Sequence, residues 1–313
     1  MIESGQPHEA LFLVLPYLHL FQLLVMKKVC RSIRDVINGD VLLWLDIVVE
    51  PPLSLRVSDN ILVMITSNAH GRLRTLALIN CVRITDEALQ RVIENNPRIN
   101  KLYIPGCTSL TADGIVRAVK KLTEHNHDLK RLRLHGVYGI TRQHIETLYS
   151  CLNISQLQQE QQKQHSTFRD YRCFSPLRHE STTSPIDVEV CPRCKDIRLV
   201  FDCPRESCNR TEPLSSECRG CFFCIPRCVE CGGCIDLTEM GHTICIDFLC
   251  LDCWIPLPKC NMCNKAYCSL HADQQRNPGD VTGFICEACF TLSTGAMART
   301  SSESEHEEDI IED

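Results

Sequence analysis

The sequence predicts a mixed α/β protein made of several domains, and three observations predict it. Before residue 40, apolar residues recur at spacings of three and four, which is typical of one apolar helical face. Between residues 73 and 137, a pattern of leucine and isoleucine occurs three times. From Cys191 to Cys289 the chain holds 18 of its 23 cysteines. At 313 residues, the chain is long enough for two domains of ordinary size.

Residues 8–38 are expected to form two or three short helices. Their apolar side chains fall at positions 11, 14, 15, 18, 23, 24, 29, 33 and 36. This spacing places them on one side of each helix. Periodicity alone is equally compatible with a small helical hairpin that has its own core.

The central part of the chain contains a repeated motif. Residues 73–81 read L-x-x-L-x-L-x-x-C, residues 99–107 read I-x-x-L-x-I-x-x-C, and residues 129–137 repeat the motif in degenerate form. A helical segment follows each copy, for example ITDEALQRVI, in which the threonine is expected to cap the helix. This is the leucine-rich-repeat pattern, with short strands whose leucines point inward. Residues 42–47 are interpreted as an earlier, imperfect copy, and Cys81 and Cys107 as small core residues.

The repeats are followed by segments that lack any such pattern. Residues 153–190 are polar and rich in glutamine, serine and threonine, which predicts a linker. Residues 293–313 end in an acidic stretch that is expected to be disordered. The domain boundaries predicted on this basis are 8–48, 49–152, 153–190, 191–292 and 293–313.

The cysteines of residues 191–292 are interpreted as metal ligands. The N-terminus has no basic region typical of a signal peptide, and no apolar stretch approaches the ~20 residues that cross a bilayer. A nuclear or cytoplasmic location is therefore expected, where thiols stay reduced. Repeated C-x-x-C turns can present two sulfurs to one ion, which favours zinc. Iron–sulfur clusters and a disulfide scaffold are the weaker alternatives.

The sequence predicts about four zinc ions. The candidate ligands are Cys191, Cys194, Cys203, Cys208, Cys218, Cys221, Cys224, Cys228, Cys231, Cys234, Cys245, Cys250, Cys253, Cys260, Cys263, Cys268, His271, Cys286 and Cys289, with His242 as a further possibility.

Spacing suggests how some of these ligands group. One group is expected to be Cys191, Cys194, Cys203 and Cys208, and another Cys260, Cys263, Cys286 and Cys289. Cys268 and His271 are expected to pair with an earlier couple such as Cys250 and Cys253. The grouping of the remaining cysteines cannot be assigned from spacing.

Charge and motifs argue against two classes of function. Residues 1–150 carry 18 basic and 14 acidic side chains, whereas residues 151–299 carry 15 basic and 18 acidic ones. A cysteine-rich domain without excess positive charge lacks the usual electrostatic footprint of a nucleic-acid binder. The sequence has no glycine-rich phosphate loop, no GxSxG and no HExxH motif, so no catalytic site is predicted.

The N-terminal stretch contains, in this order, Pro7, Leu11, Val14, Leu15, Leu18, Leu23, Val29, Cys30 and Ile33. In this pattern it resembles an F-box, the helical motif that docks onto the Skp adaptor of SCF ubiquitin ligases, and the resemblance implies that these residues bind the adaptor. The sequence departs from the family pattern at Gln6, Gln22 and Ile33, where the family usually has leucine, aspartate and often tryptophan.

Taken whole, the sequence resembles plant Skp-interacting F-box proteins that combine leucine-rich repeats with a cysteine-rich C-terminus. The blocks CPRC, CIPRCVECGGCI and LCLDCW carry this resemblance. It implies an N-terminal helical F-box, a short leucine-rich-repeat solenoid and a C-terminal multi-zinc domain. It also implies a non-catalytic substrate receptor that works with the Skp adaptor, a cullin scaffold and an unknown target protein. A stand-alone RING-like ligase and a zinc-dependent nucleic-acid or chromatin binder are the alternatives.

Overall fold

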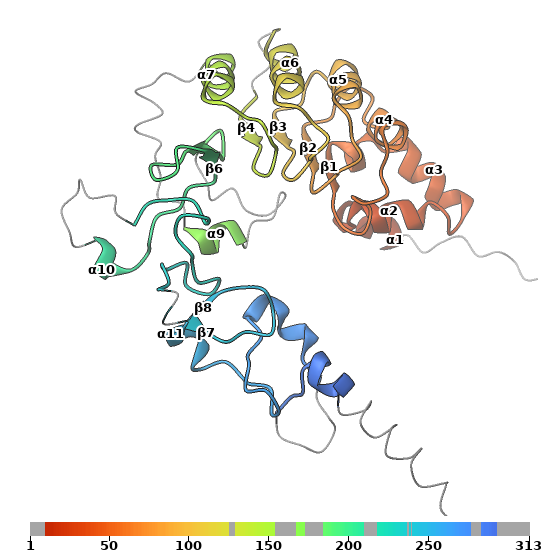
Figure 1. The fold of residues 1–313 in the computed structure, drawn as a ribbon. Helices are drawn as coiled ribbons and strands as arrows, with labels where there is room; N and C mark the ends of the chain where they lie inside the picture. The colour runs from red at the N-terminus through yellow and green to blue at the C-terminus, as the bar shows by residue number, and fades with distance from the viewer. Residues whose placement is uncertain are drawn as a thin grey trace, which may run out of the picture. The chain divides into compact units, whose positions relative to one another are not determined.

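The computed structural model of the chain describes residues 10–124, 129–153, 167–172, 184–209, 218–236, 238, 240–276 and 283–292. The chain divides into two compact units (Figure 1). The first unit consists of Met1–Ser166 and Phe174–Val200, and the second of Thr167–Cys173 and Phe201–Asp313. Within the described residues, no helix combines the length and the apolar character that crossing a membrane requires.

Short helices open the first unit, as the sequence predicts. They are α1 (Ala10–Val14), the 3-10 helix η1 (Leu15–Tyr17), α2 (Leu20–Met26), α3 (Arg31–Gly39) and the 3-10 helix η2 (Val41–Trp44). The side chain of Gln22, one of the departures from the F-box pattern, accepts a hydrogen bond from the His19 amide and so caps α2. Trp44 is fully buried, and its indole N–H donates to the Ile37 carbonyl at 2.8 Å.

A series of β-α units follows the N-terminal helices. The strands are β1 (Asp46–Val49), β2 (Thr75–Leu78), β3 (Lys101–Tyr103) and β4 (Arg131–Arg133), and the helices are α4 (Asp59–Ser67), α5 (Asp86–Asn95), α6 (Ala112–Thr123) and α7 (Arg142–Cys151). The strands form one parallel sheet in the order β1-β2-β3-β4. All four helices lie in a row along one side of this sheet (Figure 1). Parallel strands require such crossover connections, which here contain the helices.

The register of the sheet explains the repeated motif. Ile47, Leu76, Leu102 and Leu132 are aligned across the four strands, and all are buried in one apolar core. The sequence analysis aligned residues 42–47 with residues 73–78, but this copy of the motif lies two positions later in the structure. Ile47 pairs with Leu76 instead of Leu78, and Leu42 is exposed. The buried Trp44 therefore occupies the position of the motif that Leu73 occupies in the next β-α repeat.

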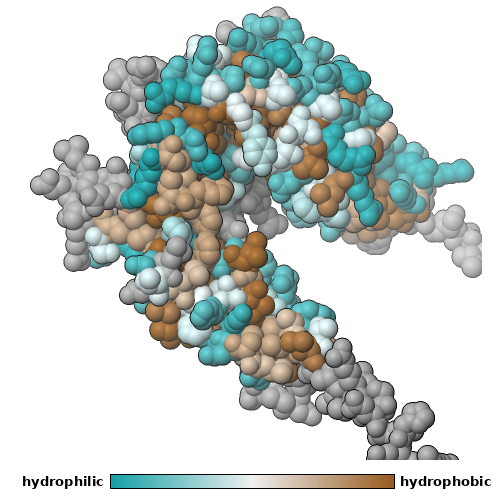
Figure 2. Space-filling model, viewed as in Figure 1, coloured by the Kyte–Doolittle hydropathy of each residue, from teal (hydrophilic) through white to brown (hydrophobic). Residues whose placement is uncertain are grey.

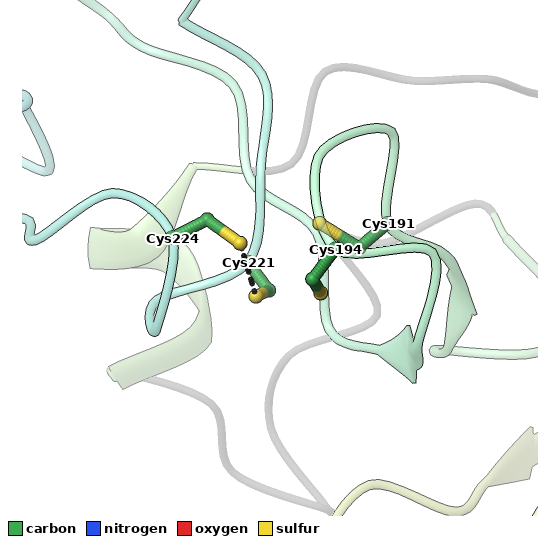
Figure 3. A group of neighbouring side chains, drawn as sticks. All are labelled: Cys191, Cys194, Cys221 and Cys224. Carbon is green, nitrogen blue, oxygen red and sulfur yellow. Dashed lines mark hydrogen bonds between the residues drawn. The ribbon is translucent and has the colours of Figure 1, made fainter.

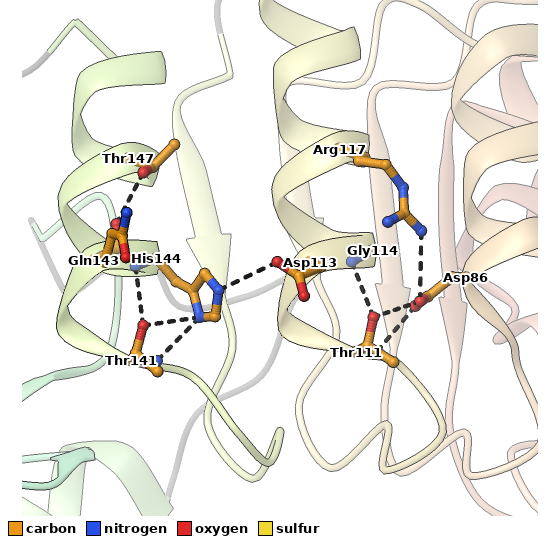
Figure 4. A network of polar contacts seen from close by, with 9 residues as sticks. All are labelled: Asp86, Thr111, Asp113, Gly114, Arg117, Thr141, Gln143, His144 and Thr147. Carbon is orange, nitrogen blue, oxygen red and sulfur yellow. Dashed lines mark hydrogen bonds and ion pairs between the residues drawn. The ribbon is translucent and has the colours of Figure 1, made fainter.

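A ladder of hydrogen bonds joins the N-termini of neighbouring helices. The Asp86 carboxylate of α5 accepts from the backbone and the hydroxyl of Thr111, which itself caps α6 at the Gly114 amide (Figure 4). Asp59 of α4 receives the same two bonds from Thr85, the cap of α5, which confirms the predicted threonine cap. Because each cap also binds the preceding helix, the ladder fixes the spacing between neighbouring β-α repeats.

The last step of the ladder uses a histidine. The His144 ring lies 3.3 Å from the Asp113 carboxylate through Nε2, and its Nδ1 accepts from the Thr141 amide at 3.1 Å (Figure 4). Thr141 in turn caps α7 at the His144 amide. The imidazole thus joins Asp113 to Thr141, where the earlier β-α repeats have a direct aspartate–threonine contact.

Residues 184–188 cover the open edge of β4. Ile186 forms a parallel bridge with Leu132 and is buried in the core, as is Val188. The Asp187 carboxylate accepts from the backbone amides of Leu134 and His135 and contacts the His135 ring. Burial, the largest influence, raises the pKa of Asp187, but His135, Arg133 and the Leu134 amide outweigh it and the net pKa is lowered. The sequence analysis placed this segment at the end of a linker.

A small hairpin follows that segment, and then the second unit, whose described helices and strands are all short. The hairpin pairs β5 (Glu189–Val190) with β6 (Ile197–Arg198). The second unit contains α9 (Phe168–Arg172), α10 (Glu206–Asn209), β7 (Met240–Gly241), β8 (Leu249–Cys250), α11 (Leu251–Trp254) and the 3-10 helix η3 (Ser269–Gln274). Phe222 stacks between Phe168 and Phe248, with ring centroids 5.1 Å and 5.7 Å away, whereas Phe223 is exposed. Cysteines are prominent among the other buried side chains of this unit, together with apolar residues such as Leu249 and Phe284.

Candidate metal centres and docking residues

Five groups of side chains in the described residues could each hold a metal ion. Within each group, four potential ligand atoms lie within 4.8 Å of one another. All of the 19 predicted ligands fall into these groups, and Asp247 is the single addition. The sequence predicted about four ions, so the structure offers one group more than expected.

Three of the C-x-x-C turns share one local structure. The residue after the second cysteine has a left-handed backbone, with φ of 66° at Lys195, 76° at Gly232 and 53° at Asn264. Its amide donates to the carbonyl of the first cysteine at 2.8–2.9 Å. Glycine and asparagine adopt this conformation readily. The turn is therefore encoded locally, and it holds both sulfurs on one side.

The first group contains Cys191, Cys194, Cys221 and Cys224. Figure 3 shows the four side chains with their sulfur atoms turned toward one another. The sulfurs of Cys221 and Cys224 are 3.6 Å apart.

The second group contains Cys203, Cys208, Cys218 and Cys234. It overturns the predicted set of Cys191, Cys194, Cys203 and Cys208, because Cys203 and Cys208 lie with two later cysteines. The fully buried Arg227 stabilises this arrangement by donating to the carbonyls of Phe201 and Cys218, each at 2.7 Å.

The third and fourth groups each combine two C-x-x-C turns. The third contains Cys228, Cys231, Cys250 and Cys253, so the predicted pairing of Cys250 and Cys253 with Cys268 and His271 is wrong. The fourth contains Cys260, Cys263, Cys286 and Cys289, the set that spacing predicts. A C-x-x-C turn looks the same whichever partner it has, so only the path of the chain selects the partner.

The distances between sulfurs fit a tetrahedral zinc site. With zinc–sulfur bonds of about 2.3 Å, two sulfurs of a tetrahedron lie about 3.8 Å apart. The observed separations are 3.7 Å for Cys208 and Cys234, 3.8 Å for Cys231 and Cys250, and 3.9 Å for Cys263 and Cys286. A disulfide would need a separation of about 2.05 Å. None of the cysteines in the described part of the chain forms a disulfide.

Backbone amides prepare some of these thiols for metal binding. The Cys286 amide donates to the Cys260 sulfur and the Cys234 amide to the Cys203 sulfur. Burial raises both pKa values, but backbone donors outweigh it and lower the pKa of Cys260 to about 6 and of Cys203 to about 7. Since the thiolate is the form that binds metals, these amides favour occupation of the groups.

The fifth group has a mixed set of donors: Cys245, Asp247, Cys268 and His271. Asp247 Oδ2 lies 3.4 Å from Cys268 Sγ and 3.2 Å from His271 Nδ1. Burial, and then the hydrogen bond with Asp247, raise the pKa of Cys268 to about 12. The sequence analysis did not name Asp247, because an isolated aspartate between cysteines is not distinctive. His242, the further candidate, is in none of the five groups.

The predicted adaptor-binding residues divide by burial. Leu15, Leu23 and Ile33 are buried in the core, and Leu18 and Cys30 are partly buried against it. Leu11, Val14 and Val29 are exposed. Pro7 lies outside the described residues. Further exposed apolar residues that the sequence analysis did not name lie between them: Leu13, Tyr17, Phe21 and Val25.

Comparison with known proteins identifies similar chains. A family model described as the At3g27290 F-box protein C-terminal domain matches residues 187–262. The chain is 41% identical to F-box protein SKIP28 of Arabidopsis thaliana over 293 residues, which is 90% of each chain. It is 36% identical to F-box protein SKIP14 and 35% identical to F-box protein At3g27290, both of Arabidopsis thaliana. These matches cover 82% and 79% of this chain, and 56% and 65% of the two relatives.

Proposed function

The chain belongs to the family of F-box proteins that includes SKIP28, SKIP14 and At3g27290 of Arabidopsis thaliana, and from this premise we propose that it is the substrate-recognition subunit of an SCF-type E3 ubiquitin ligase. The observation that carries the proposal is the similarity to SKIP28, which extends over 90% of both chains. In this role the chain makes no covalent bond itself. It holds a target protein near the ubiquitin-transferring subunits of a nuclear or cytoplasmic complex.

Residues 8–48 dock the Skp adaptor in this proposal. Exposed apolar residues between Leu11 and Val29 support it, because contiguous apolar surface usually marks an interaction site. Figure 2 shows apolar surface at this end of the first unit. Leu15, Leu23 and Ile33 contribute by supporting the docking helices from within the core.

The rest of the chain holds the target. The β-α units of residues 49–152 act as a leucine-rich-repeat domain, and residues 191–292 as a zinc-bound scaffold. The parallel sheet with its aligned leucines supports the first assignment. Sulfur separations near 3.8 Å support the second. Zinc sites closed by four protein ligands have no open position for a substrate, which supports a structural role for the four-cysteine groups.

Adaptor capture tests the proposal. Purified Skp adaptor is used to capture the full chain and a Val29→Asp variant. Val29 is 63% exposed, so the new carboxylate costs the free chain little, but it places an uncompensated charge in an apolar interface. Capture is expected to fall by at least 10-fold, the equivalent of about 1.4 kcal/mol.

The matched control is Met64→Asp on α4, a side chain that is 62% exposed and lies outside residues 8–48. It is expected to leave capture unchanged. Leu15→Ala is unsuitable as a probe, because removing a buried leucine destabilises the unit itself by about 2–5 kcal/mol. If the Skp adaptor does not capture the wild-type chain, the proposed function is wrong.

A further inference from the structure

The fifth group differs from the other four in the chemistry of its ligands. We propose that Cys245, Asp247, Cys268 and His271 form a fifth zinc site in which Asp247 supplies the fourth ligand, and that this site releases its ion before the four-cysteine sites do. The inference rests on the proposed zinc-bound scaffold. It extends that scaffold to a site that neither spacing nor any similarity assigns.

The distances within the group form one face of a coordination tetrahedron. The sulfur of Cys268, the Nδ1 atom of His271 and the Oδ2 atom of Asp247 are separated pairwise by 3.1, 3.2 and 3.4 Å. A zinc ion with bonds of about 2.0–2.3 Å to such atoms would place them about 3.3–3.6 Å apart, so the three atoms lie within about 0.5 Å of the separations that zinc needs. Hydrogen bonds alone would not require all three pairs to be this close. Cys245, whose sulfur lies within 4.8 Å of each of these atoms, supplies the remaining corner.

Local backbone structure holds the first two ligands in place. The Thr243 hydroxyl donates to the carbonyls of Cys245 and Asp247 at 2.8 and 2.9 Å, which closes a tight turn. The turn places both side chains in the group, whereas Ile246 between them is 96% exposed. The Asp247 side chain is almost fully buried. Its Oδ2 atom accepts from the Cys268 thiol and lies beside the His271 ring, so this carboxylate oxygen faces two potential zinc ligands.

The other two ligands belong to a second turn that is also anchored. Cys268 is the residue before η3, and His271 lies one turn further along. The Glu230 carboxylate accepts from the amide and the hydroxyl of Ser269, at 2.6 and 2.8 Å. Glu230 lies between Cys228 and Cys231 of the third group, so this contact joins the two groups. The fifth site is therefore built onto a turn that a four-cysteine group already holds.

The donor set predicts the order of release. Two thiolates, one carboxylate and one imidazole carry less negative charge than four thiolates, and soft thiolates bind zinc more strongly than a carboxylate does. The His271 side chain is also 31% exposed, so water and chelators reach the ion. Exposure alone does not set the fifth group apart, because Cys194 of the first group is also exposed, so the order of release is inferred from the donor set. The ion of the fifth group is thus the most exchangeable of the five.

Zinc content of the full chain, purified by itself under reducing conditions, tests the site. Elemental analysis is expected to find five zinc ions per wild-type chain and one fewer in Asp247→Ala. The matched control is Asp273→Asn, an exposed acid on η3 that is in none of the groups, and it is expected to retain all five. Equal zinc content in the wild type and Asp247→Ala would overturn the proposal.

Graded chelation tests the order of release. With a colorimetric chelator, the wild type is expected to lose one ion in an early, separate phase that Asp247→Ala lacks. Asp247→Cys should keep five ions and slow the early phase, and it serves as the deciding variant if Asp247→Ala does not fold. Simultaneous release of all ions from the wild type, or an unchanged early phase in Asp247→Cys, would overturn the proposal. Adaptor capture, measured on the same samples, reports on the proposed function independently, because it depends on residues 8–48.

Discussion

The first unit buries mostly aliphatic side chains, whereas many of the buried side chains of the second unit are cysteines that belong to groups of potential metal ligands. The described helices α4–α7 of the first unit are 9–12 residues long. In the second unit, α10 and α11 have four residues each and η3 has six. Helices this short bury little apolar surface, so their stability must come from elsewhere.

The difference shows two ways in which one chain reaches a defined structure. In the first unit, each β-α repeat buries one more layer of leucines against its neighbour. In the second unit, a bound zinc ion would replace many apolar contacts, because structural zinc contributes on the order of 10 kcal/mol of folding free energy. The two units should therefore respond differently to the same treatment.

Removing zinc is expected to produce the largest difference between the two units. A strong chelator under reducing conditions should abolish the protection of second-unit amides from hydrogen exchange, because each lost ion removes on the order of 10 kcal/mol. Amides of β2 and β3 in the first unit should keep their protection. Mass spectrometry of exchanged peptides measures both regions at once.

The reverse experiment uses Leu102→Ala in the core of the first unit. It is expected to destabilise that unit by about 2–5 kcal/mol and to leave the zinc content unchanged.

In the chelator experiment, a second unit that keeps its protection from hydrogen exchange would contradict the distinction between the units.

Acid is expected to weaken the first unit at its β4 edge. The net pKa of Asp187 is lowered in the folded state, so its contribution is fully present above the unfolded value of about 3.9 and is lost as the pH falls below that value. Exchange of the Leu134 amide, measured between pH 3 and 7, should therefore accelerate beyond its intrinsic dependence on pH in acid.

In Asp187→Asn the same edge should be weaker at pH 7 by about 1–3 kcal/mol, because one strong acceptor is lost, and the additional acid effect should disappear. Asp196→Asn, at an exposed carboxylate, is the control and should behave as wild type. If the acid response persists in Asp187→Asn, titratable groups other than Asp187 cause it.

The smallest expected effect concerns the ladder of hydrogen bonds between the helices. A Cβ atom added at Gly114 would lie 2.1–2.2 Å from the Asp86 carboxylate, which must then move and weaken its bonds to Thr111. At Gly39, by contrast, an added Cβ meets nothing within 4 Å. Gly114→Ala is expected to be less stable than Gly39→Ala by about 1 kcal/mol, the usual value of one capping contact. Chemical denaturation of the first unit measures the difference, and equal stability would show that Asp86 adjusts freely.

Local patterns were sufficient for some features of the structure. The spacing of Leu76, Leu102 and Leu132 identified the aligned core positions of the sheet, because strand residues two apart share one face. The repeated C-x-x-C turns identified which cysteines belong to groups of potential metal ligands, but not which turns share a group, since each turn is formed by a few neighbouring residues. Period-two alternation at Ile186, Val188 and Val190 was a strand signal that could have revealed the segment on the β4 edge.

The amino-acid sequence alone thus specified several of the strands, the threonine cap of α5 and the C-x-x-C turns, because those choices depend on backbone preferences over a few residues. Only the tertiary structure decided which two turns share a group, that Asp247 joins Cys245, Cys268 and His271, and that Leu15 and Ile33 lie inside while Val29 lies outside. These outcomes depend on how distant segments pack, and segments with the same local pattern can pack against different partners.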